Sequence, residues 1–149
     1  MQAFHIKCNP PKSTAQSGSQ ILMGKGGKRF IGRKKNSKAE GAKHDLMLLL
    51  SENVPDKPHE GPVRVLIVWA YPWRKSEPKK NRVHGVKYCN TRPDIDNLCK
   101  MLFDSMTRLA FWNDDSQVAS LAFKKIWSDE AGISIKIIPI EEISQCLPE

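Results

Sequence analysis

The sequence predicts a single α+β domain in which a mixed β-sheet carries two main helices and long basic loops connect the elements. Three observations lead to this prediction. Two separate segments repeat apolar residues at the spacing of an amphipathic helix, and several others alternate apolar and polar residues as strands do. Strands and helices follow one another without serial strand–helix–strand units. The chain of 149 residues can bury one core without disulfides or a structural metal, so residues 1–149 are expected to form one domain.

The N-terminal region combines a short strand with a long basic loop. Phe4 to Cys8 alternates apolar and polar side chains and then meets two prolines, which cannot continue a central strand. Ser, Gly, Gln, Lys and Arg dominate the following stretch, which predicts a mobile basic loop over residues 13–35. Its MGKGGK run lacks the full G-x-x-x-x-G-K-[ST] pattern, so a nucleotide-binding loop is not expected there.

The first helix and a central strand are expected in the middle of the chain. Ser37 and Glu40 have the spacing of a capping box, and apolar residues follow at helical intervals, which predicts a helix from about Lys38 to Glu52. Val63 to Ala70 is apolar at almost every position and is expected to be a strand buried on both faces. A second mobile basic loop is predicted over residues 74–92.

A second helix and two more strands complete the expected fold. The most strongly amphipathic stretch of the chain predicts a helix from Asp94 to Arg108. Gln117 to Trp127 is rich in β-forming residues, and Gly132 to Pro139 alternates isoleucine with polar side chains, so both are predicted strands. The acidic segment from Glu141 to Cys146 is expected to form a helical turn.

The charge of the chain indicates a polyanionic partner. A formal net charge of +8 and a pI near 9.4 favour binding to nucleic acid or to an anionic membrane surface. Acidic residues nevertheless gather around the second helix. A protein that only coats polyanions has little use for carboxylates beside its basic surface, whereas a metal-dependent nuclease needs both.

The cysteines and the hydropathy of the chain indicate a cytoplasmic protein. Four cysteines without a CxxC pair are expected to be reduced thiols, namely Cys8, Cys89, Cys99 and Cys146. His84 and Cys89 lack the additional ligands that a zinc site requires. No apolar stretch has the length of a signal peptide or a membrane-spanning helix, so no membrane association is expected.

The basic residues of the two loops are the predicted contacts to DNA phosphates. Runs of charge are usually only solvated surface, but the second loop leads directly into an acidic cluster at Asp94. The predicted DNA-binding residues are Arg33, Lys34 and Lys35 in the first loop and Arg74, Lys75, Lys79, Lys80, Arg82, Lys87 and Arg92 in the second.

Carboxylates at the start of the second helix have the chemistry of a metal site. Asp94 and Asp96 flank the helix N-terminus, where side chains two positions apart can still converge on one ion, and Mg²⁺ prefers such hard oxygen ligands. The free N–H groups of the helix end favour a bound phosphate. Lys100 lies one turn further along and can stabilise the charge that develops during phosphodiester cleavage.

Each acidic residue also has a purely structural explanation. Asp94 is a suitable N-cap, and Asp96, Lys100 and Asp104 have the spacing of an ion-pair ladder. The segment Asn113–Asp115 has the composition of a turn. On these residues alone, a non-catalytic nucleic-acid-binding protein and a phosphotransferase that uses D-x-D to hold a nucleotide–metal complex stay open as alternatives.

The order of residues at both ends of the second helix resembles a known nuclease signature. The matching residues are Pro93, Asp94, Ile95, Asp96, Asn97, Leu98, Lys100 and Asp104, followed by the run Phe111-Trp112-x-Asp114-Asp115-x-Gln117-Val118. They resemble the RusA family of Holliday junction resolvases, which phages and prophages often carry. The resemblance implies a homodimeric, Mg²⁺-dependent endonuclease that cuts paired strands of four-way DNA junctions in recombination and repair.

The resemblance also assigns roles to individual residues. It implies that Asp94, Asp96 and Asp115 are catalytic metal ligands and that Lys100 is the essential basic residue. Asp114 and Asp104 match the family with supporting roles.

Asp115 poses a geometric problem, because a helix from Asp94 to Arg108 is about 22 Å long and Asp115 follows its far end. Six or seven extended residues return about 20 to 24 Å. Closure of the site within one chain is the preferred expectation, and the alternative is that a partner subunit supplies Asp115.

Overall fold

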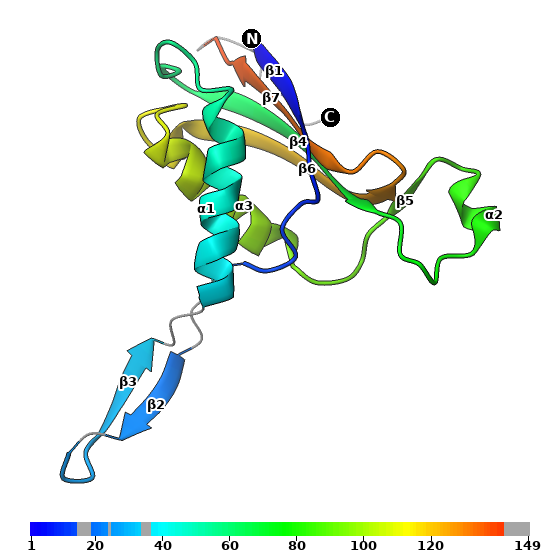
Figure 1. Cartoon of the computed structure of the whole chain (residues 1–149). Coiled ribbons are helices and arrows are strands. Elements are labelled where there is room, and N and C mark those ends of the chain that lie inside the picture. The colour runs from blue at the N-terminus through cyan, green and yellow to red at the C-terminus, as the bar shows by residue number, and fades with distance from the viewer. Residues whose placement is uncertain (15–18, 24, 34–36, 142–149) are drawn as a thin grey trace.

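A computed structural model of the chain describes residues 1–14, 19–23, 25–33 and 37–141. In these ranges the chain forms a five-stranded sheet, two long helices that lie on one face of this sheet, and a separate two-stranded hairpin (Figure 1). The predicted α+β class with a mixed sheet is therefore confirmed. In chain order the elements are β1 (Gln2–Lys7), β2 (Ser19–Met23), β3 (Arg29–Arg33), α1 (Ser37–Ser51), β4 (Val63–Pro72), α2 (Lys79–Arg82), β5 (Val86–Tyr88), α3 (Ile95–Arg108), the 3-10 helix η1 (Asp115–Gln117), β6 (Val118–Ser128) and β7 (Gly132–Pro139).

The sheet has the strand order β1-β7-β4-β6-β5. β4 is central as predicted: it pairs antiparallel with β7 and parallel with β6. A parallel neighbour requires a crossover connection, and α3 lies within the connection from β4 to β6. The sheet therefore fixes where both ends of α3 lie, because β5 precedes α3 and β6 follows it.

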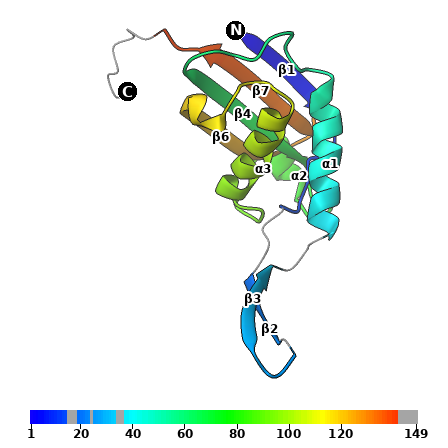
Figure 2. The same cartoon turned by 90° about the vertical axis from the view of Figure 1, so that its left-hand side faces the viewer.

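The core lies between the sheet and the two long helices (Figure 2). α1 contributes Leu46 and Leu50, and α3 contributes Leu98, Leu102 and Met106, all of which are completely buried. These positions follow the helical spacing that predicted both helices. The sheet completes the core with Val63, Val65, Ile67, Trp69, Ile133, Ile135 and Ile137.

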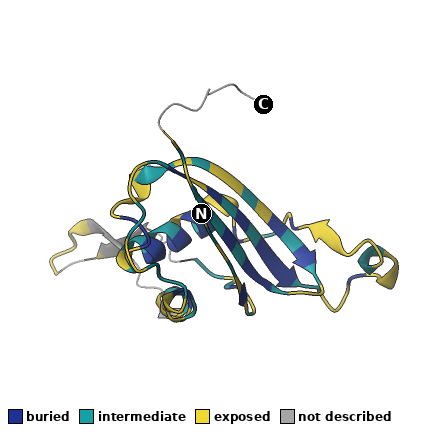
Figure 3. Cartoon of the chain, turned by 90° about the horizontal axis from the view of Figure 1, so that it is seen from above, coloured by how far each residue is buried: buried dark blue, intermediate teal, exposed yellow. Residues whose placement is uncertain are grey.

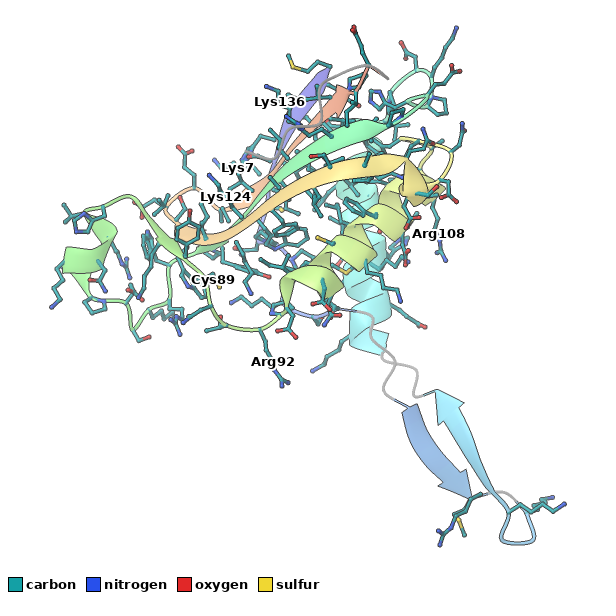
Figure 4. The ribbon with its side chains drawn as sticks, turned by 180° about the vertical axis from the view of Figure 1, so that it is seen from behind. Lys7, Cys89, Arg92, Arg108, Lys124 and Lys136 are labelled. Carbon is teal, nitrogen blue, oxygen red and sulfur yellow. The ribbon has the colours of Figure 1, made fainter. Side chains whose placement is uncertain are left out.

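The other face of the sheet is not covered by any helix among the described residues. The prediction that β4 is buried on both faces is therefore wrong, since Arg64 is exposed and Leu66 and Val68 are only half-buried. Lys7, Lys124 and Lys136 project from this open face, as the view from behind shows (Figure 4). The open face also holds an apolar hollow of about 610 Å³, which Leu66, Val68 and Ala122 help to line.

The first basic region is not a simple loop as predicted. Residues 19–23 and 29–33 pair antiparallel as the hairpin β2–β3, which projects from the body of the molecule (Figures 1 and 2). Gly26 and Gly27 adopt positive φ angles of 81° and 74° in its turn, a conformation that glycine reaches without a steric penalty. Gly26 and Gly27, which suggested a loop, form the turn that allows β2 and β3 to pair.

The second basic region also contains regular structure that the sequence did not predict. Within it, Lys79–Arg82 forms α2 and Val86–Tyr88 forms β5, which pairs with the C-terminal end of β6. We call residues 74–92 the basic arm. Its α2 end is exposed and lies on the opposite side of the molecule from the β2–β3 hairpin (Figure 3).

Two further expectations concern the end of the chain and membranes. The predicted helical turn over Glu141–Cys146 falls, beyond Glu141, outside the described residues. Among the described residues, no helix combines the length and the apolar character needed to cross a membrane.

Candidate active site

Asp94 begins α3 but does not use its carboxylate to cap the helix. Its backbone is extended, with φ −74° and ψ 151°, and its carbonyl oxygen accepts the N–H of Leu98 at 3.1 Å. The side chain is exposed and makes no capping hydrogen bond. The capping explanation of this residue is therefore not supported, and both carboxylate oxygens remain available to a ligand.

Asp96 and Lys100 lie on the exposed side of the first two turns of α3. Neither side chain takes part in a hydrogen bond or an ion pair with any described residue. The expected ladder along the helix is not formed, because Asp104 instead pairs with Lys43 of α1 at 3.3 Å. That ion pair connects the two helices and leaves Lys100 free at the α3 N-terminus.

A buried lysine, which the sequence interpretation overlooked, holds the segment that leads into α3. The Lys125 side chain is 7% exposed, and its ammonium group donates hydrogen bonds to the carbonyl oxygens of Thr91 at 2.5 Å and Pro93 at 2.6 Å. The N–H of Cys89 donates to the carbonyl of Lys125 at 2.8 Å. Lys125 therefore fixes the backbone immediately before Asp94 to strand β6.

A sequence signal for Lys125 was present. Strand alternation places it on the same face as Phe123 and Trp127, and this face packs on the core. A single charge on the buried face of a strand requires partners inside the protein.

The thiol beside this site is not suited to nucleophilic chemistry. Cys99 is 9% exposed, and burial, together with the negative charge of Asp96, raises the pKa of its thiol to about 11. A thiol with such a pKa stays protonated at neutral pH. Cys8, Cys89 and Cys99 are all free, which agrees with the prediction of reduced thiols, and Cys146 lies outside the described residues.

Some cations of the basic arm are engaged in holding the arm itself together. The buried Glu77 accepts hydrogen bonds from Asn81 and from Lys87, each at 2.8 Å, and these bonds lower the pKa of its carboxyl group. The Arg74 guanidinium lies 4.9 Å from the centre of the Trp127 ring. Arg82 donates to the carbonyl oxygen of Arg74 at 3.1 Å. Lys87 and Arg82 are therefore less available to DNA than the sequence suggested.

The remaining cations of the arm are exposed and free. Lys75, Lys79, Lys80 and Arg92 make no hydrogen bond or ion pair with a described residue. Arg92 stands two residues before Asp94, at the N-terminal end of α3 (Figure 4). Free positive charge thus lies next to the free carboxylates, as a phosphodiester substrate requires.

The predicted DNA contacts of the first basic region are placed only in part. Arg33 ends strand β3, whereas Lys34 and Lys35 lie outside the described residues. The hairpin nevertheless carries exposed cations near its tip, at Lys28 and Arg29.

At the other end of α3, Asp114 has a structural role. Its carboxylate accepts the N–H of Ser116 at 2.8 Å, and hydrogen bonding by Ser116 lowers the pKa of this carboxyl group. Gln117 completes a capping box by accepting the N–H of Asp114. Its amide also donates to the carbonyl oxygens of His59 and Gly61, both at 2.9 Å. The turn that presents Asp115 is therefore held by hydrogen bonds on both sides.

The Asp115 side chain is exposed and has no hydrogen-bond or ion-pair partner among the described residues, but it lies far from Asp94. The 14 residues of α3 rise about 21 Å between the two acidic ends. Strand β6 gives an independent measure of this distance. Its residue Lys125 contacts Pro93, next to Asp94, and its residue Val118 directly follows η1, which contains Asp115. Val118 and Lys125 are about 23 Å apart, at about 3.3 Å per residue. Arg92 and Arg108 mark the two ends of α3 in Figure 4.

The expectation that one chain closes the site is therefore wrong. β6 returns in parallel with β4 from the η1 end of the molecule, so the short η1 segment cannot bring Asp115 back to the start of α3. Consistent with this, no group of three or more acidic, histidine or cysteine side chains capable of holding a metal occurs among the described residues.

The residues at the α3 N-terminus fit part of a metal site. Asp94 and Asp96 offer hard oxygen donors that no described protein cation neutralises, which suits Mg²⁺ or Mn²⁺ better than a soft metal. Two carboxylates form an open site that leaves room for water and phosphate oxygens. Asp115, the third carboxylate that the resemblance implies, does not lie beside them in this chain.

The chain was compared with known proteins. The model of the family described as endodeoxyribonuclease RusA matches residues 11–138. Over 61 residues the chain is 38% identical to the crossover junction endodeoxyribonuclease rusA of Lactococcus phage r1t, an alignment that covers 41% of this chain and 47% of the phage protein. Over 106 residues it is 29% identical to the uncharacterized protein YqaN of Bacillus subtilis (strain 168), and this alignment covers 68% of this chain and 74% of the Bacillus protein.

The family match includes the sheet from β4 to residue 138 of β7, both long helices and the acidic residues at both ends of α3, whereas strand β1 lies before it. The chain spans about half the length of the phage relative that it matches. Because the family model extends over most of the sequence, this protein belongs to the RusA family of endodeoxyribonucleases.

Proposed function

We propose that this protein is a Mg²⁺-dependent, structure-specific endonuclease that resolves four-way DNA junctions in the cytoplasm, during recombination and repair. The observation that carries the proposal is the α3 N-terminus, where Asp94 and Asp96 are free beside the free cations Lys100 and Arg92. The family supports DNA cleavage as the reaction. The phage relative carries a crossover junction endodeoxyribonuclease name, which supports branched DNA as the substrate.

Each group at this site has a distinct task in phosphodiester cleavage. Asp94 and Asp96 would hold Mg²⁺, which would supply a Lewis acid for the attacking water and the scissile phosphate. Lys100 offsets the negative charge that builds up on the phosphate oxygens. The first N–H groups of α3 face the same region and favour an anion there. Lys75, Lys79 and Lys80 of the basic arm contact the DNA backbone.

The active enzyme is a homodimer in which Asp115 of one subunit completes the metal site of the other. The separation of about 21 Å along α3 supports this arrangement, because a single chain supplies Asp94 and Asp96 at one end of the helix and only Asp115 at the other. A two-fold axis places two such sites in one dimer, which suits the paired cuts that a symmetric four-way junction requires.

Cleavage of four-way, flap and duplex DNA, measured in parallel with and without Mg²⁺, tests the function. The four-way junction is expected to be cut only with the metal. Asp94→Asn is expected to lower the cleavage rate at least 100-fold, because it removes a metal ligand, while junction binding without metal stays within twofold. Asp45→Asn, the same change at an exposed residue of α1, is the control and should cleave normally. Cutting without metal would contradict the proposal.

A nucleic-acid-binding protein with structural carboxylates is the second candidate. Under that reading, Asp94→Asn, Asp96→Asn and Asp115→Asn should leave every measurable activity unchanged. None of these three carboxylates has a hydrogen-bond or ion-pair partner in the part of the chain that the structure describes, whereas a structural carboxylate has protein partners, as Asp114 does, and this difference argues against the second candidate.

A further inference from the structure

The basic arm carries a group of exposed apolar side chains. Val83, Val86 and Tyr88 are 83%, 54% and 72% exposed, and all three lie within six consecutive residues. Two of them, Val86 and Tyr88, are two positions apart on β5 and therefore project from the same face of this strand. We call these two residues the β5 patch. Single exposed apolar residues are common, but apolar side chains gathered in one place mark an interaction site.

Hydrogen bonds hold β5 in the position that exposes this patch. The buried Glu77 accepts hydrogen bonds from Asn81 of α2 and from Lys87 of β5, each at 2.8 Å, so it connects the two elements. The Lys87 side chain is directed toward Glu77, and alternation along the strand directs Val86 and Tyr88 away from it. β5 pairs with β6 and is the last strand of the sheet, so no described strand borders its outer edge. The arm thus presents an aromatic ring on a fixed support.

The charges around the β5 patch indicate what binds there. α2 packs beside β5 and carries the exposed Lys79 and Lys80, neither of which has a hydrogen-bond or ion-pair partner among the described residues. Glu77 is the only acidic residue in the sequence of the arm, and it is buried and paired with Lys87. The fitting partner is therefore a polyanion that also offers apolar surface. A nucleic acid with an uncovered base is such a partner, because aromatic side chains stack on bases while lysines contact phosphates.

A four-way junction uncovers the faces of its bases only where the arms meet. In a continuous duplex, each base pair is covered by its two neighbours, so a protein reaches only the base edges in the grooves. At the centre of the junction, the last base pair of an arm can lose one neighbour, and its face then becomes available for stacking.

We propose that the β5 patch recognises the branch point of the junction, with Tyr88 stacked on the last base pair of one arm and Val86 beside it. This inference rests on the proposed function, and it names the feature that distinguishes a four-way junction from a duplex for this protein. The neighbouring Lys79 and Lys80 contact the phosphates of the same arm.

The β5 patch is close enough to the proposed metal site to act on the same junction. Tyr88 and Asp94 are six positions apart in the sequence, so their Cα atoms are at most about 21 Å apart. Both ends of the connecting segment are bound to Lys125, whose carbonyl accepts the N–H of Cys89 and whose ammonium group donates to the carbonyl of Pro93. The patch and Asp94 are therefore held at a fixed distance, and a branch point bound at Tyr88 determines which phosphate lies at the metal site.

Binding of the metal-free protein to a four-way junction and to a linear duplex tests the patch. Tyr88→Ser is expected to lower the affinity for the junction about 10-fold, because stacking is lost, and to leave the affinity for the duplex within twofold. Tyr88→Phe keeps the ring and is expected to bind the junction as the parent chain does. Leu48→Ser is the matched control, because Leu48 is 58% exposed on α1, and it should bind both DNAs normally. An unchanged junction affinity of Tyr88→Ser, equal losses on the two DNAs, or a loss in Tyr88→Phe as large as in Tyr88→Ser overturns the proposal.

Photochemical cross-linking locates the contact on the DNA. 5-Iodouracil is placed in turn at each base next to the branch point and, as a control, in the middle of an arm. Irradiation is expected to cross-link Tyr88 to a branch-point base, because the ring stacks there, and not to the base within the arm. Peptide mapping identifies the residue. If no branch-point base gives a product at residue 88, or the arm base gives as much of it, the proposal is contradicted.

These binding measurements separate the recognition of the branch point from the reaction. A parent chain that prefers the junction through Tyr88 but cuts no DNA with Mg²⁺ supports this inference and contradicts the proposed function. A parent chain that cuts junctions, with a Tyr88→Ser variant that keeps the preference for the junction, overturns the inference and leaves the function standing. If Tyr88→Ser instead changes the mass measured by sedimentation, the patch is a contact between protein chains and the inference fails.

Discussion

At the scale of single residues, the position of the proposed catalytic carboxylates depends on Lys125, which lies outside the proposed site. Lys125 is buried, and its ammonium group donates two hydrogen bonds, to the carbonyl oxygens of Thr91 and Pro93. Asp94 follows this anchored segment directly and begins α3. Lys125 is therefore a positioning residue, comparable to the outer-shell groups that orient the ligands of a metal.

Lys125→Met tests this role, because methionine has a similar length but cannot donate a hydrogen bond. The two carbonyls lose their partners, so residues 89–98 of the metal-free protein are expected to exchange their amide hydrogens faster. Cleavage is expected to fall about 10- to 100-fold, with a higher Mg²⁺ requirement, while junction binding is retained. Lys124→Met, one residue earlier and exposed on the open face, is the control. Unchanged exchange over residues 89–98 would refute the role.

The sequence revealed some residues of the site but not this one. Asp94, Asp96 and Lys100 lie within one short segment, so their spacing was sufficient to predict them together. Lys125 is distant in sequence, and its partners are backbone carbonyls, which have no residue signature. Only the alternation of Phe123, Lys125 and Trp127 on one face indicated that its side chain points inward.

At the scale of elements, the basic arm is a braced structure that presents a smaller set of free cations than its composition suggests. The buried Glu77 neutralises Lys87, and Arg74 stacks on Trp127. Lys75, Lys79 and Lys80 are exposed, have no hydrogen-bond or ion-pair partner among the described residues, and are the proposed contacts to DNA. The number of free cations, not the total charge, should then determine how strongly binding depends on salt.

Replacement of Lys75, Lys79 and Lys80 by alanine tests the arm. Each lost phosphate contact is expected to flatten the slope of log affinity against log salt by about 0.9, because fewer counterions are released. The matched control replaces Lys7, Lys124 and Lys136 on the open face, which changes the net charge equally (Figure 4). An equal loss of slope in the control would show that the arm has no special contact with DNA.

Elements with strong internal periodicity were predictable, and those that depend on a partner strand were not. α1, α3, β4, β6 and β7 all lie close to their expected ranges, because burial on one face imposes a repeating pattern. β5 has three residues and exists through its pairing with β6. The β2–β3 hairpin depends on its glycine turn, and its composition resembles that of a loop.

At the scale of the whole molecule, the fold separates the acidic ends of α3, so that Asp94 and Asp115 of one chain lie about a helix length apart. The sequence predicted the helix length and posed the problem of Asp115. It did not settle the problem, because the direction in which β6 returns depends on the strand order of the sheet.

The most direct test of the account is to mix subunits that carry Asp94→Asn with subunits that carry Asp115→Asn after each variant alone has been shown to be inactive. In a shared-site dimer, a mixed pair has one site without either carboxylate and one intact site. The mixture is therefore predicted to nick a four-way junction with Mg²⁺, and mixing either inactive variant with itself is predicted to give no cleavage. If the mixed subunits, shown to exchange, are as inactive as each variant alone, Asp94 and Asp115 do not act across the dimer.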